Sequence, residues 1–158
     1  MRSEEEANRA IERYADTVRR ICMVHLKNYA DTEDIFQTVF LKYVLYSEPF
    51  ENEEHEKAWI IRVTINECKD FLKNIFRRHT SLEEAQEIPI EEKEDLSYIR
   101  EAVLKLPDKY KSVIYLFYYE GYTAVEIAGI LHKKENTVYT WMNRARQMLK
   151  DMVGGDVE

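Results

Sequence analysis

The chain has 158 residues, which suits one ordinary domain or two small ones. Hydrophobic residues make up 45% of it, so it can bury a core and is not intrinsically disordered. With only 4 Gly and 3 Pro, and long stretches rich in helix-forming residues, it is expected to be all-α.

Nothing in the sequence predicts a secreted or membrane-inserted protein. The N-terminal stretch MRSEEEANRA is charged, and the longest apolar run, residues 113–119, is far shorter than the roughly 20 residues of a membrane span. Cys22 and Cys68 form no CxxC pair, so we expect two reduced, buried thiols. We therefore expect a cytoplasmic protein.

Charge is distributed unevenly along the chain, whose formal net charge is −7. Residues 1–56 carry 7 basic and 13 acidic side chains, and residues 81–101 carry 2 and 8. Residues 57–80 carry 6 basic and 2 acidic side chains, and residues 132–150 carry 5 and 1. Because salt screens charges over about 10 Å, these two basic blocks matter more than the total. The acidic net charge does not exclude nucleic acid.

Three helices are predicted in the first half of the chain. Apolar residues recur at helical spacing from about residue 4 to 28, and Asp31 or Thr32 can cap a second helix that ends near Tyr46. A third helical pattern covers about residues 57–78. We expect these helices to form one compact domain over residues 1–78.

Residues 79–95 separate this domain from the rest of the chain. They contain Pro89 and many glutamates, which is typical of a linker extended by self-repulsion. In the following domain, residues 96–158, Thr123 and Glu126 are expected to form a capping box. The helical patterns there cover residues 96–106, 108–120, 124–131 and about 135–153.

The last two of these patterns are joined by about three residues, which is the arrangement of a helix-turn-helix. In the final one, apolar residues recur every three or four positions, and amides, hydroxyls and guanidinium groups lie between them. Such groups suit base edges and phosphates. A plain amphipathic helix with a solvated polar face explains this helix alone equally well.

The chain resembles the bacterial sigma factors of the sigma-70 family, extracytoplasmic-function type. Residues 106–150 are similar to the family's C-terminal promoter-reading domain, and residues 31–44 and 57–78 to its second region. The C-terminal landmarks are Leu106-Pro107, Glu120-Gly121-Tyr122-Thr123, Glu126-Ile127-Ala128, Thr137-Val138 and Arg144-Ala145-Arg146. The N-terminal ones include Trp59, Arg62, Asn66 and Asp70.

In the family, the helix that matches residues 34–43 docks on core RNA polymerase. The resemblance implies polymerase contacts from Asp34, Gln37, Phe40 and Leu41. For each aromatic residue of this helix, a place in the core is the simpler interpretation.

In the family, the helix that matches residues 57–78 opens the DNA and captures a base of the minus-ten element. The resemblance implies that Asn66 faces the base and that basic residues hold the backbone; the residues concerned are Trp59, Arg62, Asn66, Lys69, Lys73 and Arg77. Trp59 is a stacking platform or a core residue, and Arg62 is a DNA contact or a salt-bridge partner. The loop expected to complete this pocket, Ser47–Glu56, is acidic.

For the minus-thirty-five element, the resemblance implies reading by Asn136, Thr137, Tyr139, Thr140, Asn143 and Arg144, with a phosphate contact from Arg146. Tyr139 and Trp141 stand where the family has basic or small polar residues. His132 takes the turn position where glycine is usual. We therefore expect an unusual or weak sequence preference at this element.

These features predict an alternative sigma factor that is not an enzyme and needs no cofactor or metal. The histidines are scattered and no nucleophile–base pair or metal-ligand set is apparent. Its expected partners are core RNA polymerase, promoter DNA and an anti-sigma factor, and it is expected to be a monomer when free. The alternatives are a stand-alone helix-turn-helix regulator and a degenerate sigma-like protein that no longer reads DNA.

Overall fold

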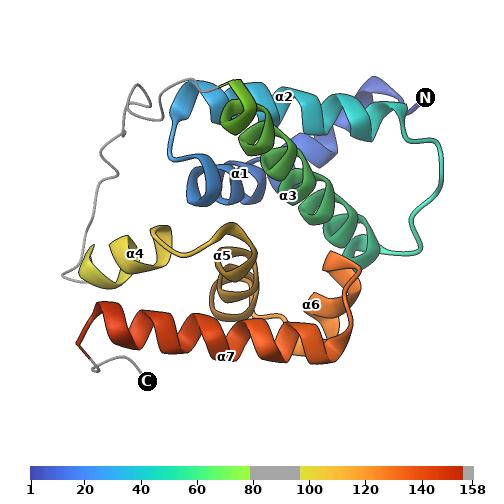
Figure 1. Ribbon diagram of the computed structural model, residues 1–158. Helices are drawn as coiled ribbons and strands as arrows, with labels where there is room; N and C mark the ends of the chain where they lie inside the picture. The colour runs from blue at the N-terminus through green and yellow to red at the C-terminus, as the bar shows by residue number, and fades with distance from the viewer. Residues whose placement is uncertain (79–96, 155–158) are drawn as a thin grey trace. The chain divides into compact units, whose positions relative to one another are not determined.

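The computed structural model describes residues 1–78 and 97–154, and every secondary-structure element in these ranges is helical (Figure 1). The chain divides into two compact units, residues 1–88 and 89–158. The linker predicted over residues 79–95 lies outside the described residues. No described helix is long and apolar enough to cross a bilayer.

The N-terminal unit consists of α1 (Glu4–Leu26), α2 (Tyr29–Leu45) and α3 (Glu53–Arg78), each packed against the other two (Figure 1). Its core is built from one apolar stripe of each helix, because residues three or four apart lie on the same helix face. The completely buried members include Val18, Val39 and Ile60.

The start of α2 differs from the prediction. Asn28 caps this helix, and its side-chain oxygen accepts a hydrogen bond from the Asp31 N–H at 2.9 Å. The predicted cap at Asp31 or Thr32 is therefore wrong. The reason lies in the preceding residue, because Lys27 adopts the left-handed conformation that ends α1 and lets Asn28 begin the next helix.

Helix α3 begins four residues earlier than the pattern indicated. The Asn52 side chain accepts from the His55 N–H at 2.8 Å, so the glutamates at 53, 54 and 56 lie in the first turn of the helix. Carboxylates are favourable there because the helix dipole is positive at its N-terminus. The acidic loop is therefore shorter than expected and covers residues 46–52.

Both cysteines lie in the core of the N-terminal unit, as predicted. Cys22 of α1 and Cys68 of α3 have no solvent exposure, and their sulfur atoms are 3.9 Å apart. This distance is far longer than a disulfide bond of about 2 Å, so both are thiols.

The C-terminal unit consists of α4 (Ser97–Leu104), α5 (Asp108–Ile114), η2 (Tyr115–Tyr119), α6 (Ala124–Leu131) and α7 (Glu135–Met152). Helix α7 packs along α5 and α6 (Figure 1). The capping box is confirmed: the Thr123 N–H donates to Glu126 at 2.9 Å, and the Glu126 N–H donates to the Thr123 hydroxyl at 3.2 Å.

The helix predicted over residues 108–120 is regular only in its first half. From Tyr115 it widens into a π-helical turn, in which the Glu120 N–H donates to the Tyr115 carbonyl at 3.2 Å. Tyr118 and Tyr119 lie in this turn, and both are more than half exposed. π-helical turns are rare and are often found at functional sites.

The turn between α6 and α7 contains a left-handed residue that is not glycine. His132 has φ 55° and donates its backbone N–H to the Ala128 carbonyl, which closes α6. A side chain in this conformation costs about 1–2 kcal/mol, because Cβ approaches the following carbonyl.

Replacing His132 with glycine should therefore stabilise the C-terminal unit by about 0.5–1 kcal/mol. His132→Ala is the matched control, because alanine removes the imidazole but keeps the Cβ. Urea unfolding of both variants measures the difference. Equal stability of the glycine and alanine variants would show that the backbone conformation at this residue carries no cost.

Candidate nucleic-acid interface

Helix α7 has one buried and one exposed face. Its buried residues are those of the predicted apolar stripe, Val138, Met142, Ala145 and Leu149, with at most 5% exposure. The proposed reading residues lie on the remaining surface. Asn136, Tyr139, Thr140, Asn143 and Arg144 are exposed, and Thr137 and Arg146 are half-buried.

Arg146 is held by the π-helical turn. Its Nε–H donates a 2.9 Å hydrogen bond to the Tyr118 hydroxyl, and its guanidinium lies 5.6 Å and 5.7 Å from the ring centres of Phe117 and Tyr118. The terminal N–H groups of this guanidinium make no hydrogen bond to the residues that the structure describes. They can therefore bind an anion without breaking the contacts that orient the side chain.

Trp141 is half-buried on the other flank of α7. The ammonium group of Lys109, from α5, lies 5.7 Å from the centre of its ring, and that of Lys133, from the turn before α7, lies 5.9 Å away. The tryptophan is thus surrounded by positive charge supplied by neighbouring elements. The sequence did not indicate this cluster.

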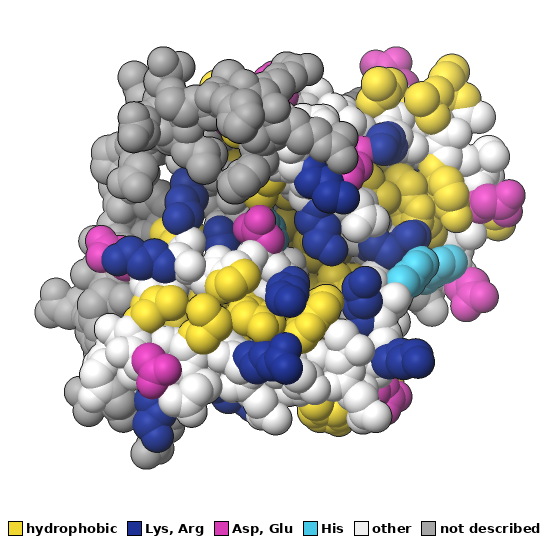
Figure 2. All heavy atoms as spheres, viewed as in Figure 1, with side chains coloured by type: hydrophobic (Ala, Val, Ile, Leu, Met, Phe, Trp, Pro, Cys, Tyr) yellow, Lys and Arg dark blue, Asp and Glu magenta, His cyan; other side chains and the backbone are white. Residues whose placement is uncertain are grey.

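Helix α3 carries the second set of candidate DNA contacts. Arg62, Asn66, Lys69 and Lys73 recur at helical spacing and share one face, on which the last three are exposed and Arg62 is half-buried. Figure 2 shows Lys and Arg side chains over this helix. Arg77 lies in the last turn of α3, and its side chain is outside the described residues.

The basic residues on these two helices differ in their pairing from three basic residues of α1 and α2. Arg13, Arg19 and Lys42 each form an ion pair with a glutamate. Within the described part of the chain, no carboxylate lies within ion-pairing distance of the basic side chains on the candidate DNA faces, namely Arg62, Lys69, Lys73, Lys109, Lys133, Arg144 and Arg146. Their charge is available to phosphates.

Trp59 lies in the core rather than on the exposed face of α3. It is 8% exposed, and its ring centre is 4.7 Å from Tyr46, 5.7 Å from Phe50 and 6.1 Å from Tyr43. In this arrangement the Trp59 ring packs against Tyr46 and Phe50 of the loop that precedes α3 and supports that loop from the core. Its ring is not open to a base in this structure.

Arg2 fastens the same loop, and sequence reasoning missed it. Its guanidinium donates to the Glu48 carbonyl, pairs with Glu6 at 3.3 Å and lies over the rings of Tyr43 and Phe50 at 4.9 Å and 4.8 Å. The backbone N–H of Arg2 also donates to the Val44 carbonyl at 2.8 Å. In the sequence, Arg2 is simply one more charged residue next to the glutamates at 4, 5 and 6, so nothing indicated this role.

Helix α2 presents a mixed polar and apolar stripe. Asp34, Gln37 and Leu41 are exposed, whereas Phe40 is 6% exposed and packs in the core. Leu45, one turn beyond Leu41, is 60% exposed and was not singled out from the sequence. Two exposed leucines on one helix face suit a contact with another protein.

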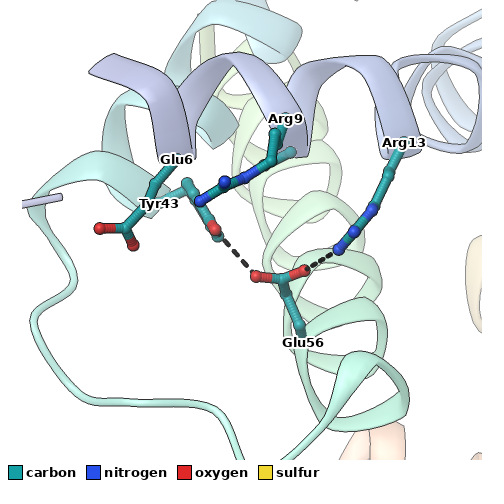
Figure 3. Close-up of a pocket in the computed structure, with 6 residues that line it drawn as sticks. Glu6, Arg9, Arg13, Tyr43 and Glu56 are labelled. Atoms are coloured by element: carbon teal, nitrogen blue, oxygen red, sulfur yellow. Dashed lines mark hydrogen bonds and ion pairs between the residues drawn. The ribbon is translucent and has the colours of Figure 1, made fainter. Parts of the chain in front are cut away.

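A polar pocket with a volume of about 300 Å³ opens where α1 meets the first turn of α3. In Figure 3, Arg13 and Tyr43 point at the Glu56 carboxylate from two different helices. Glu56 accepts hydrogen bonds from the hydroxyls of Tyr14 at 2.9 Å and Tyr43 at 2.8 Å, and it lies 3.8 Å from Arg13. Its charge is therefore compensated inside the unit.

This arrangement raises the pKa of both tyrosines. Burial, followed by the hydrogen bond to Glu56, raises the pKa of Tyr43 to about 12 and that of Tyr14 still further. An unfolded tyrosine ionises near pH 10. The folded state therefore keeps its phenol protons where the unfolded state loses them, and the stabilisation present below pH 10 is lost as pH rises toward 12.

We expect the free energy of unfolding of the N-terminal unit to fall steeply between pH 10 and pH 12. A variant with Tyr14→Phe and Tyr43→Phe has no phenol to ionise at this place, so its stability should fall less over the same interval. Urea unfolding at several pH values measures both slopes. Parallel slopes would contradict the contribution assigned to the two tyrosines.

The described residues contain no group of three or more side chains suited to hold a metal ion. What they do contain is two helical units, each with an exposed helix face that carries unpaired basic groups and amides. The second unit has the helix–turn–helix arrangement of α6 and α7. The geometry is that of a two-domain, all-helical protein whose second unit contains a helix-turn-helix.

Comparison with known proteins identifies the family. Residues 10–78 match the model of sigma-70 region 2, and residues 96–149 match that of sigma-70 region 4. The chain is 30% identical over 134 residues to the RNA polymerase sigma factor SigV of Bacillus subtilis, covering 83% of this chain and 81% of SigV. It is 25% identical over 158 residues to the ECF RNA polymerase sigma factor SigW of the same organism, covering 89% and 84%.

The chain therefore belongs to the sigma-70 family and is an alternative sigma factor of the extracytoplasmic-function type. It directs RNA polymerase to promoters and is not a catalyst. The fold agrees with solved structures. The sigma factor RpoE of Bartonella quintana, in complex with NepR, has a TM-score of 0.72 at 19% identity and covers 96% of this chain and 99% of its own. CnrH in complex with the cytosolic domain of CnrY has a TM-score of 0.68 at 21% identity, with coverages of 98% and 91%.

Proposed function

We propose that α7 reads the minus-thirty-five element of a promoter and that the exposed face of α3 opens and reads the minus-ten element. The observation that carries this proposal is that basic side chains on these two helix faces lack carboxylate partners among the described residues, whereas Arg13, Arg19 and Lys42 are paired. A surface prepared for phosphates has this property.

Within this proposal, the domains are residues 1–78 for polymerase and the minus-ten element, a linker over 79–95, and residues 96–158 for the minus-thirty-five element. On α3, Asn66 faces the captured base and Lys69 and Lys73 hold the backbone. The loop over residues 46–52 completes the pocket, and Arg2 and Trp59 hold it in place.

The exposed stripe of α2 is proposed to contact core RNA polymerase. Asp34 and Gln37 supply polar contacts and Leu41 supplies an apolar one, extended by Leu45. Phe40 supports this helix from the core. The inner face then belongs to the fold and the outer face to the partner.

We also propose that an anti-sigma factor binds this chain and holds it inactive in the cytoplasm, where the free chain is a monomer. Support comes from the two solved relatives, each of which is in complex with another protein, NepR described as an anti-sigma factor and the cytosolic domain of CnrY. Their likeness to this chain extends over almost its whole length.

Run-off transcription tests the proposal. A fragmented genomic library is transcribed by purified core polymerase with and without this protein, and the new start sites are mapped. We expect discrete new start sites that share two sequence elements upstream. A stable complex with core polymerase that yields no new transcript would support a degenerate, partner-binding protein, and no complex at all would leave a stand-alone regulator.

A further inference from the structure

The exposed face of α7 has two sides, and the two arginines of the Arg144-Ala145-Arg146 stretch lie on opposite ones, with Arg146 at the edge next to the core. In an α-helix, residues two apart are separated by about 160° around the axis. Ala145, between them, is completely buried, so the arginines leave the core on its two sides. The Tyr118 hydroxyl orients Arg146 on one edge.

The opposite edge carries more positive charge than α7 itself supplies. Trp141 precedes Arg144 by three residues and therefore lies on the same side of the helix. Lys109 and Lys133, from two other elements, both direct their ammonium groups to its ring, at 5.7 Å and 5.9 Å. We name Lys109, Lys133 and Trp141 the Trp141 edge. Figure 2 shows basic and apolar side chains next to one another over α5 and along α7.

The two ammonium groups of this edge are not compensated within the unit. No carboxylate of the described residues lies within ion-pairing distance of Lys109 or Lys133. The indole attracts each of them by a cation–π interaction, and the Tyr110 ring, whose centre is 5.2 Å from the Lys109 ammonium, attracts that lysine as well. Two lysines without a carboxylate partner beside one ring attract anionic groups, and the phosphates of a DNA backbone are such groups.

The width of the DNA major groove indicates what the two edges of α7 would contact. The major groove is about 12 Å wide and is bounded by a phosphate backbone on each side, and a helix with its side chains is about 10–12 Å thick. A helix lying in the groove therefore directs its opposite edges to opposite backbones. Arg146 and the Trp141 edge are placed in this way.

We propose that the Trp141 edge binds phosphates of one promoter strand, on the side of the groove opposite to the phosphate contacted by Arg146. Lys109 and Lys133 make the contacts, and Trp141 is a positioning residue that gathers them and does not read a base. This inference rests on the proposed role of α7 at the minus-thirty-five element.

The salt dependence of promoter binding tests the inference. Each phosphate contact made by a lysine contributes about 0.9 to the slope of log K against log salt concentration. The holoenzyme formed with Lys109→Gln or Lys133→Gln should bind a promoter fragment with a slope smaller by about 0.9, and the double variant with one smaller by about 1.8. The preference for the intact over a scrambled minus-thirty-five element should stay the same.

Two controls separate phosphate binding from general effects of charge and folding. Lys105→Gln removes one exposed charge beyond α4 and should leave the slope unchanged. Lys109→Arg with Lys133→Arg keeps both charges and should also keep the slope. Trp141→Leu should weaken binding severalfold without changing which sequences are preferred.

The outcomes distinguish this inference from the proposed function. If the wild-type holoenzyme starts transcription at discrete promoters but the double glutamine variant keeps its salt slope, the Trp141 edge does not bind phosphate. If Trp141→Leu changes the preferred base, the ring reads DNA and its assigned role is wrong. If the wild type recognises no promoter, the proposed function itself fails.

Discussion

Replacing Glu56 with alanine is expected to destabilise the N-terminal unit by about 2–4 kcal/mol. The substitution removes the acceptor of two tyrosine hydroxyls, from Tyr14 and Tyr43, whose residues are only 5% and 3% exposed. A buried donor left without a partner costs about 1–3 kcal/mol. Chemical unfolding monitored by circular dichroism measures the loss.

A matched control is available one turn away. Glu53 also pairs with Arg13, but its side chain is 71% exposed, so Glu53→Ala should cost no more than about 1 kcal/mol. A triple variant with Glu56→Ala, Tyr14→Phe and Tyr43→Phe should recover part of the lost stability, because it no longer buries unpaired hydroxyls. A Glu56→Ala variant as stable as Glu53→Ala would refute the role assigned to this carboxylate.

Replacing Arg144 with alanine is expected to reduce promoter discrimination by about 1–3 kcal/mol, a loss of roughly 5- to 150-fold. Arg144 is exposed on α7, and no other described side chain engages its guanidinium. It can therefore form two hydrogen bonds to a base edge. Competition binding of the holoenzyme to intact and altered minus-thirty-five elements measures the effect.

Arg146→Ala is the control for Arg144→Ala, because it should lower affinity without changing sequence discrimination. Arg146 is proposed to contact phosphate, so its loss should weaken binding to all sequences alike and reduce the salt slope by about 0.9. Affinity for core polymerase should be unchanged in both variants. If Arg144→Ala also weakened all sequences equally, Arg144 would be a phosphate contact and the reading of bases would fall to other residues.

The sequence predicted what depends on local periodicity. The buried stripe of α7 and the capping box of Thr123 and Glu126 were correct because each follows from residues three or four apart. The cap of α2 was wrong because several side chains near residue 30 are able to cap, and the conformation of Lys27 decided among them. The capping preference of individual side chains therefore limits the candidates for the N-cap but does not select one of them.

Features that depend on contacts between elements were not predictable in this way. Phe40 and Leu41 are both apolar neighbours on α2, yet one is in the core and the other is 59% exposed. The sequence favoured a core position for the aromatic Phe40, but only the packing of α1 and α3 against α2 shows that Leu41 stays exposed. The approach of Lys109 to Trp141 joins residues from different helices, and the wide turn after Tyr115 has no pattern of spacing that announces it.

The buried thiols of the N-terminal unit allow its opening to be measured by thiol labelling. Cys22 and Cys68 are the 2 cysteines of the chain, and both belong to the first unit, where neither is exposed. A thiol-specific reagent can reach them only after α1 and α3 separate. The rate of labelling therefore follows the opening of this unit within the full-length protein, while the second unit gives no signal, and the effect of polymerase or an inhibitor on one domain can be measured without introducing a probe.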